Sequence, residues 1–246
     1  MPRRVNNTVI TLIPKVQQPQ TMKEFRPIVC CNTVYKRIAT ILANRLKATL
    51  STVIGEQQTT CVPRRNILDG ILLMQEMVCG YHKSSERPRC ALKIDIMKTY
   101  DTIKWSFLWT VMRVMGYPER ASEDLGKGTL YPPYLFIIVM EVFTKLLRSQ
   151  EKFHYHPKCE EISLINVSFI DDLFFLSCAN VESMRLIKKV LADFGKLSRL
   201  LPNLSKSSRY FAGVTDQQAS RLSGILGIPI FELPVRYLGI SLTTKN

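Results

Sequence analysis

Acidic residues are scarce in this sequence of 246 residues: 20 aspartates and glutamates stand against 34 lysines and arginines, which leaves a formal charge of +14. Such an imbalance indicates a polyanionic partner, either nucleic acid or an anionic membrane surface. The excess of basic over acidic residues is largest in residues 1–50, which hold nine basic residues and a single acid, Glu24. A solvated basic face is the competing interpretation of this segment.

Signals for disulfides, zinc fingers and export are also missing. The seven cysteines are an odd number and none are spaced as Cys-x-x-Cys, which argues against a disulfide framework and a zinc knuckle. The first four residues carry no apolar run of a signal peptide, and the longest apolar stretch, Tyr134–Met140, is too short to span a membrane. We therefore expect reduced thiols in an intracellular protein, nuclear or cytoplasmic, with no membrane partner.

An apolar content of 46% is enough for a buried core. Apolar spacing predicts helices over 33–50, 66–81, 98–115, 133–148 and 181–201, and strands over 8–16, 90–96, 165–169 and 173–176. Residues 233–239 are predicted to form a final strand or hairpin. In the helix over 33–50 we expect the inward stripe to be Val34, Ile38, Ile41, Leu42 and Leu46. Helices mixed with short antiparallel strands predict an α+β fold.

Three carboxylates fall at strand ends or turns. Asp95 closes the strand over 90–96, and Asp171 and Asp172 lie at the tip of the hairpin over 165–176. If the two elements are neighbours in one sheet, these oxygens suit Mg²⁺ and two-metal phosphoryl transfer. Ordinary turn chemistry is the alternative. The apolar residues flanking the pair, such as Phe169 and Phe174, favour the metal, because an unligated carboxylate pair is costly among them.

Short motifs follow one another along most of the chain: Phe25–Ile28, Tyr35-Lys36, Leu42–Leu46, Gln58 with Val62-Pro63 and Arg65, Leu92–Asp95, Tyr100-Asp101, Pro133–Phe136, Phe169–Asp172, Asn203 with Lys206-Ser207, and Leu233–Gly239. This ordered set resembles the reverse transcriptases of non-LTR retrotransposons, particularly the LINE-type elements of plants. The resemblance implies an RNA-directed DNA polymerase with polymerase-type fingers and palm, an antiparallel sheet with packed helices. Fingers would span 1–89 and a partial palm 90–246, within one domain of about 22–241.

The resemblance also implies roles for individual residues. Asp95, Asp171 and Asp172 would bind Mg²⁺ or Mn²⁺ and catalyse nucleotidyl transfer, and Lys206 would protonate the departing pyrophosphate. The nucleotide would contact Lys23, Arg26 and Arg65 through its triphosphate and Tyr100 through its sugar. Each of these side chains has a plainer alternative as a surface charge, a loop lysine or a core aromatic. The expected partners are an RNA template, a DNA primer and deoxynucleotide triphosphates, with the oligomeric state left open.

Several departures from the family pattern predict an impaired polymerase. Only residues 119–132 fill a segment that is considerably longer in the family, and Lys127–Pro133 keeps just Gly128 and Pro133 of the family's Gln-Gly-Asp-Pro-Leu-Ser-Pro signature. Ile170 replaces a small residue before the acidic pair. We therefore expect an incomplete palm and no thumb. The alternatives are a non-catalytic, basic nucleic-acid-binding remnant and, disfavoured by Tyr100 and the tail motif, an RNA virus polymerase.

Overall fold

The computed structural model describes residues 8–58, 61–83, 87–96, 102–119, 132–169 and 172–244. The described strands form a four-stranded sheet of order β4-β5-β3-β6 and two separate two-stranded ribbons, β1-β2 and β7-β8. All pairings within these sheets are antiparallel. Together with the helices this confirms the predicted α+β class with an antiparallel sheet.

The four-stranded sheet is built from segments far apart in the sequence. Its strands are β3 (Arg89–Asp95), β4 (Asn166–Phe169), β5 (Asp172–Cys178) and β6 (Ser208–Ala212). Strands β3 and β5 lie at the centre, and their register sets Asp95 opposite Asp172. Because side chains alternate between the two faces of a strand, this register puts both acids on one face and Ile94 and Leu173 on the other.

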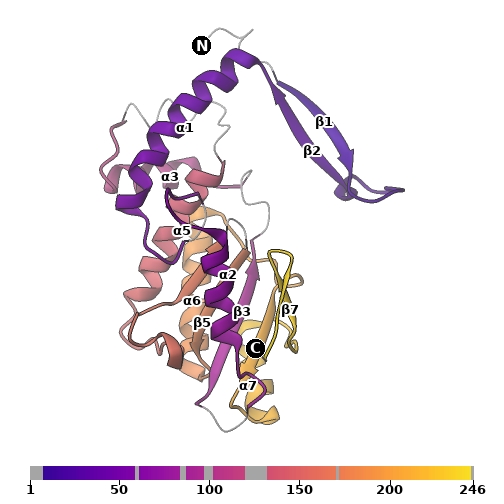
Figure 1. Cartoon of the computed structure of the whole chain (residues 1–246), viewed down its shortest axis with the longest axis vertical. Coiled ribbons are helices and arrows are strands. Elements are labelled where there is room, and N and C mark those ends of the chain that lie inside the picture. The colour runs from indigo at the N-terminus through magenta and orange to yellow at the C-terminus, as the bar shows by residue number, and fades with distance from the viewer. Residues whose placement is uncertain are drawn as a thin grey trace.

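Helices cover both faces of this sheet. One face packs Leu92, Ile94 and Phe175 against α3 (Trp105–Val114), α5 (Pro132–Arg148) and α6 (Val181–Ser198). The other packs Phe174 and its neighbours against α2 (Ile67–Val78) and the hairpin of β7 (Val235–Tyr237) and β8 (Ile240–Leu242). Figure 1 shows α2 and the β7-β8 hairpin beside β3. Helix α7 (Asp216–Leu226) follows β6 and contacts α6.

The N-terminal elements extend away from this body. Strands β1 (Thr8–Pro14) and β2 (Phe25–Cys31), joined through a short 3₁₀ helix (Met22–Glu24), form a ribbon that projects from the start of α1 (Thr33–Val53) in Figure 1. The far half of α1 packs on the body through Leu46 and Leu50, which belong to the core shared with α5. Most side chains of the ribbon are exposed.

Two details of the helices differ from the sequence-based prediction. The buried stripe of α1 consists of Tyr35, Ala39, Ala43, Leu46 and Leu50. The predicted Val34, Ile38 and Ile41 are exposed because they lie on a neighbouring stripe of the helix. Helix α3 begins at Trp105, the described residues 102–104 before it are not helical, and the N–H of Lys104 bonds the carbonyl of Ser198 at the end of α6. The predicted start at Lys98 lies outside the described residues.

All seven cysteines are free thiols in the structure. Burial raises the pKa of Cys90 and of Cys159 to about 12, so both remain protonated at neutral pH. Within the ranges that the structure describes, no helix combines the length and apolar character needed to cross a membrane.

Candidate catalytic carboxylate site

Two of the predicted acids meet at one end of the central sheet. Asp95 is the last residue of β3 and Asp172 the first of β5, and the antiparallel register makes them direct cross-strand partners. Side chains in such positions have Cβ atoms about 4.5–5.5 Å apart, and two like charges there are destabilising unless a cation lies between or beside them. Both residues are half-buried, so water and ligands can reach them.

A lysine from the same face contacts this pair. Lys93 lies two residues before Asp95, and its Nζ is 3.3 Å from Oδ1 of Asp172. The same ammonium donates a hydrogen bond of 3.1 Å to the carbonyl of Arg236 in β7. Lys93 therefore joins the acids to the β7-β8 hairpin.

The segment before β6 holds Asp95 from the other side. The N–H of Asn203 donates to the Asp95 carbonyl at 2.7 Å, and its side-chain amide lies 3.4 Å from Oδ2 of the same residue. The N–H of Asp95 donates to Oγ of Ser207 at 3.3 Å, and that hydroxyl donates to the Asn203 carbonyl at 2.8 Å. These hydrogen bonds fix the backbone and one carboxylate oxygen of Asp95 against a single turn.

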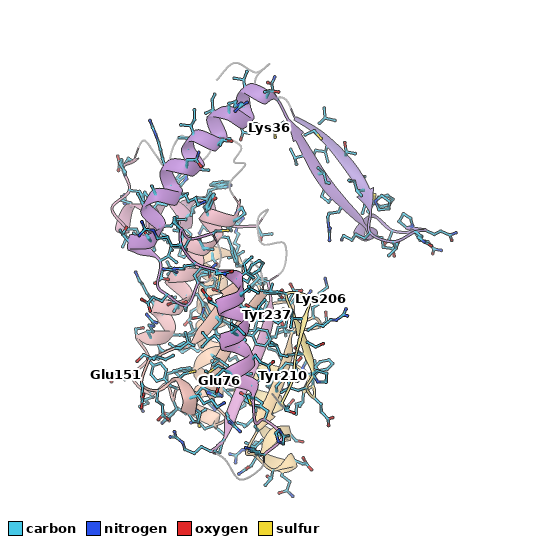
Figure 2. The ribbon with its side chains drawn as sticks, in the orientation of Figure 1. Lys36, Glu76, Glu151, Lys206, Tyr210 and Tyr237 are labelled. Atoms are coloured by element: carbon cyan, nitrogen blue, oxygen red, sulfur yellow. The ribbon has the colours of Figure 1, made fainter. Side chains whose placement is uncertain are left out.

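Lys206 belongs to this turn. Its N–H bonds the carbonyl of Asn203 at 3.1 Å and its side chain is exposed. Figure 2 labels it at the edge of the sheet beside the β7-β8 hairpin. The turn that carries the predicted proton donor therefore contacts Asp95 directly through Asn203.

Tyr237 lies close to Asp172, on the same face of the sheet. Its side chain is fully buried and its ring packs edge-on against Phe174 with the centroids 5.0 Å apart. Burial, reinforced by the negative charge of Asp172, raises the pKa of its hydroxyl. Among the described residues this hydroxyl has no hydrogen-bond partner, so one polar atom remains unsatisfied close to the carboxylates.

The predicted nucleotide-binding residues are spread over other elements. Arg26 lies in β2 opposite Ile13 and is exposed, and Lys23 belongs to the 3₁₀ helix of the same ribbon. Arg65 donates to the carbonyls of Ile54, Gly55 and Gln58 at 2.6–3.0 Å, and burial lowers its pKa. Asp171 and Tyr100 fall outside the described residues. Of the predicted site residues, the structure thus brings together Asp95, Asp172 and the turn of Lys206.

A buried carboxylate supports the loop that Arg65 holds. Glu141 of α5 is 4% exposed, and its Oε2 accepts from the N–H of Gly55 at 3.0 Å and from the amide of Gln57 at 2.9 Å. Burial raises the pKa of Glu141 against the opposing effect of the Gly55 hydrogen bond. The next residue, Gln58, bonds Ser168 of β4, the strand that leads to the acidic hairpin tip.

The donor set suits a hard divalent cation. In the part of the chain that the structure describes, no group of three or more histidines, cysteines, aspartates and glutamates forms a metal cluster. Asp95 and Asp172 nevertheless supply two adjacent carboxylates, and Mg²⁺ commonly takes one or two carboxylates and completes its shell with water and substrate phosphates. Two carboxylates opposite one another on an otherwise basic chain fit that cation.

The sequence motifs contain four further residues near the acids, Lys93, Asn203, Ser207 and Tyr237, but gave none of them a role in supporting the acids. For Lys93 a signal was present, since strand alternation puts it on the face of Asp95. The motif of Asn203 and Ser207 was visible in the sequence, but its contacts with Asp95 were not, because they join segments that are distant in the sequence.

Comparison with known proteins agrees with this arrangement. The family described as reverse transcriptase (RNA-dependent DNA polymerase) matches residues 13–242. The Transposon TX1 149 kDa protein of Xenopus laevis is 28% identical over 108 residues, which are 44% of this chain and 8% of that protein.

Two solved structures of Candida tropicalis telomerase have the same fold. The apo form truncated from its C-terminal domain has a TM-score of 0.55 at 12% identity, over 87% of this chain and 51% of that one. The telomerase complex with a TWJ fragment of telomeric RNA has a TM-score of 0.51 at 13% identity, over 84% and 41% of the two chains. The chain thus spans about half or less of these relatives.

The likeness to telomerase confirms the predicted polymerase-type fingers and palm. The family match covers nearly the whole chain, including both β3 and β5 with their opposed acids. The chain therefore belongs to the reverse transcriptase (RNA-dependent DNA polymerase) family.

Proposed function

We propose that this chain is the polymerase region of a non-LTR retrotransposon protein of the plant LINE type, which copies RNA into DNA. The observation that carries the proposal is the direct opposition of Asp95 and Asp172 on one face of the central sheet of a reverse transcriptase fold. The similarity to a transposon protein supports the retrotransposon origin. The substrates would be an RNA template, a DNA primer and deoxynucleotide triphosphates.

In this proposal Asp95, Asp171 and Asp172 hold Mg²⁺ or Mn²⁺ beside the primer terminus. The cations would activate the primer 3′-hydroxyl and stabilise the leaving oxygen. A hydrogen bond from the Asn203 amide to the Asp95 carboxylate, and one from the Asp95 N–H to Oγ of Ser207, keep Asp95 in place for that task. Lys206, exposed on the same turn, would give its proton to the departing pyrophosphate.

The nucleotide would be held by residues 1–89 as fingers against residues 90–246 as palm. Lys23 and Arg26 would bring positive charge to the triphosphate from the β1-β2 ribbon, and Tyr100 would stack beneath the sugar. For Arg65, binding a phosphate would require its guanidinium to exchange at least one of its three carbonyl partners for a phosphate oxygen.

Primer extension on an RNA template with Mg²⁺ tests the proposal. Wild type would be compared with Asp95→Asn and Asp172→Asn, and with Asp193→Asn as a matched control, because Asp193 lies on α6 across the sheet from the acids. Extension by wild type and the control, abolished in both site variants, supports the polymerase. Extension that persists in the site variants would sink it.

A non-catalytic nucleic-acid-binding remnant is the second candidate, favoured by the net charge of +14. It predicts no extension by any variant, with binding to RNA that weakens steeply as salt rises. Replacing deoxynucleotides with ribonucleotides in the extension assay tests the third possibility, an RNA virus polymerase.

A further inference from the structure

The ammonium of Lys93 occupies an unusual place for a lysine. Its residue lies inside β3, the strand flanked by β5 and β6, where it pairs with Phe174 on one side and Ser208 on the other. Only 20% of its side chain is exposed. Lysines are rarely covered to this extent unless a partner compensates the charge.

Two partners from different elements provide that compensation. Oδ1 of Asp172 lies 3.3 Å from Nζ, and the carbonyl of Arg236 accepts a hydrogen bond at 3.1 Å. The Asp172 side chain is 33% exposed, so the pair is shielded more than a surface salt bridge, and a contribution above the usual fraction of a kcal/mol is expected.

The hairpin on the other side of this bridge is small. Strands β7 and β8 have three residues each, and a two-stranded hairpin of this size is marginal by itself. Val235, Tyr237 and Leu242 anchor it in the core with α2. At the opposite end from the acids, Thr243 and Thr244 bond Gln75 and Gly80. Near the acids, the Arg236 carbonyl is held by Lys93.

We propose that Lys93 is a built-in counter-ion that couples cation occupancy of the acidic pair to the position of the β7-β8 hairpin. The inference rests on the proposed function in assuming that a divalent cation binds Asp95 and Asp172. Such a cation competes with the ammonium for the oxygens of Asp172 and repels it. Lys93 then withdraws and releases the carbonyl of Arg236, which frees the hairpin to move.

Thermodynamic linkage predicts whether removing Lys93 should strengthen or weaken cation binding. If cation binding displaces Lys93, then Lys93 must weaken cation binding by the same free energy. Removing the ammonium should therefore tighten binding. A lysine that merely stabilises the site would have the opposite effect, since its removal would leave the acids less well placed and weaken binding.

The test compares wild type with Lys93→Met, using Lys189→Met as a control for net charge, because Lys189 is exposed on α6 on the far face of the sheet. Mn²⁺ binding is measured by electron paramagnetic resonance. We expect Lys93→Met to lower the Kd by about threefold to tenfold, as removal of a nearby unit charge at partial exposure implies. The control should bind like wild type.

Hydrogen exchange of residues 235–242 provides the second readout. Without metal, exchange should be faster in Lys93→Met than in wild type. Mn²⁺ should accelerate exchange in wild type and leave Lys93→Met unchanged. Lys93→Arg, which keeps the charge and the donor, should restore slow exchange in the absence of metal.

The outcomes separate the two proposals. A wild type that binds no Mn²⁺ overturns the proposed cation site, while the metal-free exchange of Lys93→Met still tests the link to the hairpin. The counter-ion proposal is wrong if Lys93→Met does not bind Mn²⁺ more tightly than wild type. It is also wrong if hydrogen exchange of the hairpin is the same in Lys93→Met and wild type.

Discussion

Arg209 is a fully buried cation that holds the chain around α7. Its guanidinium donates to the carbonyl of Leu222 at 3.3 Å, to the hydroxyl of Ser223 at 2.5 Å and to the carbonyl of Ile228. Burial lowers its pKa. Because several acceptors depend on one side chain, its removal leaves buried polar groups without a donor.

We expect Arg209→Met to destabilise the fold by about 3 kcal/mol, the range found when a buried polar network loses a member. Urea unfolding followed by circular dichroism measures the change. Arg221→Met, at an exposed position of α7, is the matched control and should stay within about 0.5 kcal/mol of wild type. Equal stability of Arg209→Met and the control would show that the carbonyl contacts contribute little.

His156 makes the fold sensitive to acid. It is fully buried, and burial, with the nearby Arg89, lowers its pKa to about 3. Its Nδ1 accepts from the N–H of Lys158 at 3.2 Å, which leaves Nε2 to carry the proton toward the hydroxyl of Tyr81. Protonation of Nδ1 would break the hydrogen bond from Lys158.

A histidine with a depressed folded-state pKa contributes full stability above its unfolded pKa and loses it as the pH falls. Between pH 6.5 and about 3 we therefore expect stability to fall by about 1.4 kcal/mol per pH unit from this group. Urea midpoints recorded from pH 7 to pH 4 measure it. His156→Gln should flatten the profile, whereas His82→Gln, at an exposed site, should keep the wild-type slope.

At the scale of elements, Glu141 connects α5 to the loop over 54–58 and, through Gln58, to β4. Since burial raises its pKa, the fold disfavours its charge, while the N–H of Gly55 and the amide of Gln57 need its oxygen as an acceptor. Two substitutions of Glu141 distinguish the effect of its charge on stability from the effect of its hydrogen-bond acceptor.

Glu141→Gln keeps an acceptor oxygen and removes the buried charge, so its stability should equal or exceed that of wild type at pH 7. Glu141→Ala leaves both donors unpaired and should cost about 2 kcal/mol. Glu151→Ala, at an exposed position just beyond α5 (Figure 2), is the control. Thermal unfolding ranks the variants, and a glutamine variant as unstable as the alanine variant would contradict this account.

Most elements followed from the apolar spacing, because burial of an amphipathic face dominates their formation. The helix predicted over 181–201 is α6, and it buries Met184, Ile187 and Phe194 at helical spacing. Among the strands and α-helices of the described residues, β2, β6 and α7 were missed. The proline in β2 argued against a strand, but a two-stranded ribbon has open edges where a missing N–H costs nothing. Helix α7 buries only Leu222 and Leu226, too few to show a period.

The site was predictable in part. Asp95 and Asp172 could be proposed because each falls where a strand ends, and their pairing in one sheet is confirmed. The contacts of Arg65 could not be predicted from the sequence, because its three carbonyl partners lie in a loop whose shape depends on Glu141 in a distant helix.

At the scale of the whole molecule, positive charge is carried well beyond the acids. Lys36, Arg37, Arg45 and Lys47 are exposed along α1, and Figure 2 shows Lys36 near the start of this helix. Each phosphate group bound by such a residue releases counter-ions, so nucleic-acid affinity should fall with salt.

Replacing these four residues with glutamine should make the salt dependence of RNA binding shallower, by up to about 0.7 in log–log slope for each phosphate that the chain no longer neutralises. Fluorescence anisotropy from 50 to 300 mM salt, roughly the range in which such electrostatic binding dominates, measures it. Glutamine at Arg185, Lys188, Lys189 and Lys196 of α6 is the charge-matched control. Equal slopes for both variants would place the nucleic acid elsewhere.

The cross-strand pairing of Asp95 with Asp172 depends on the apolar residues that neighbour them in β3 and β5. Both faces of β5 are buried, so a slip by one residue would move Leu173 and Phe175 from the core with α5 and α6 to the differently shaped core with α2. The packing of apolar side chains on both faces thus fixes the strand register, and the contacts of the two acids add to it. A homologue that has lost both carboxylates would therefore still fold, so this fold can persist in proteins that no longer catalyse the reaction.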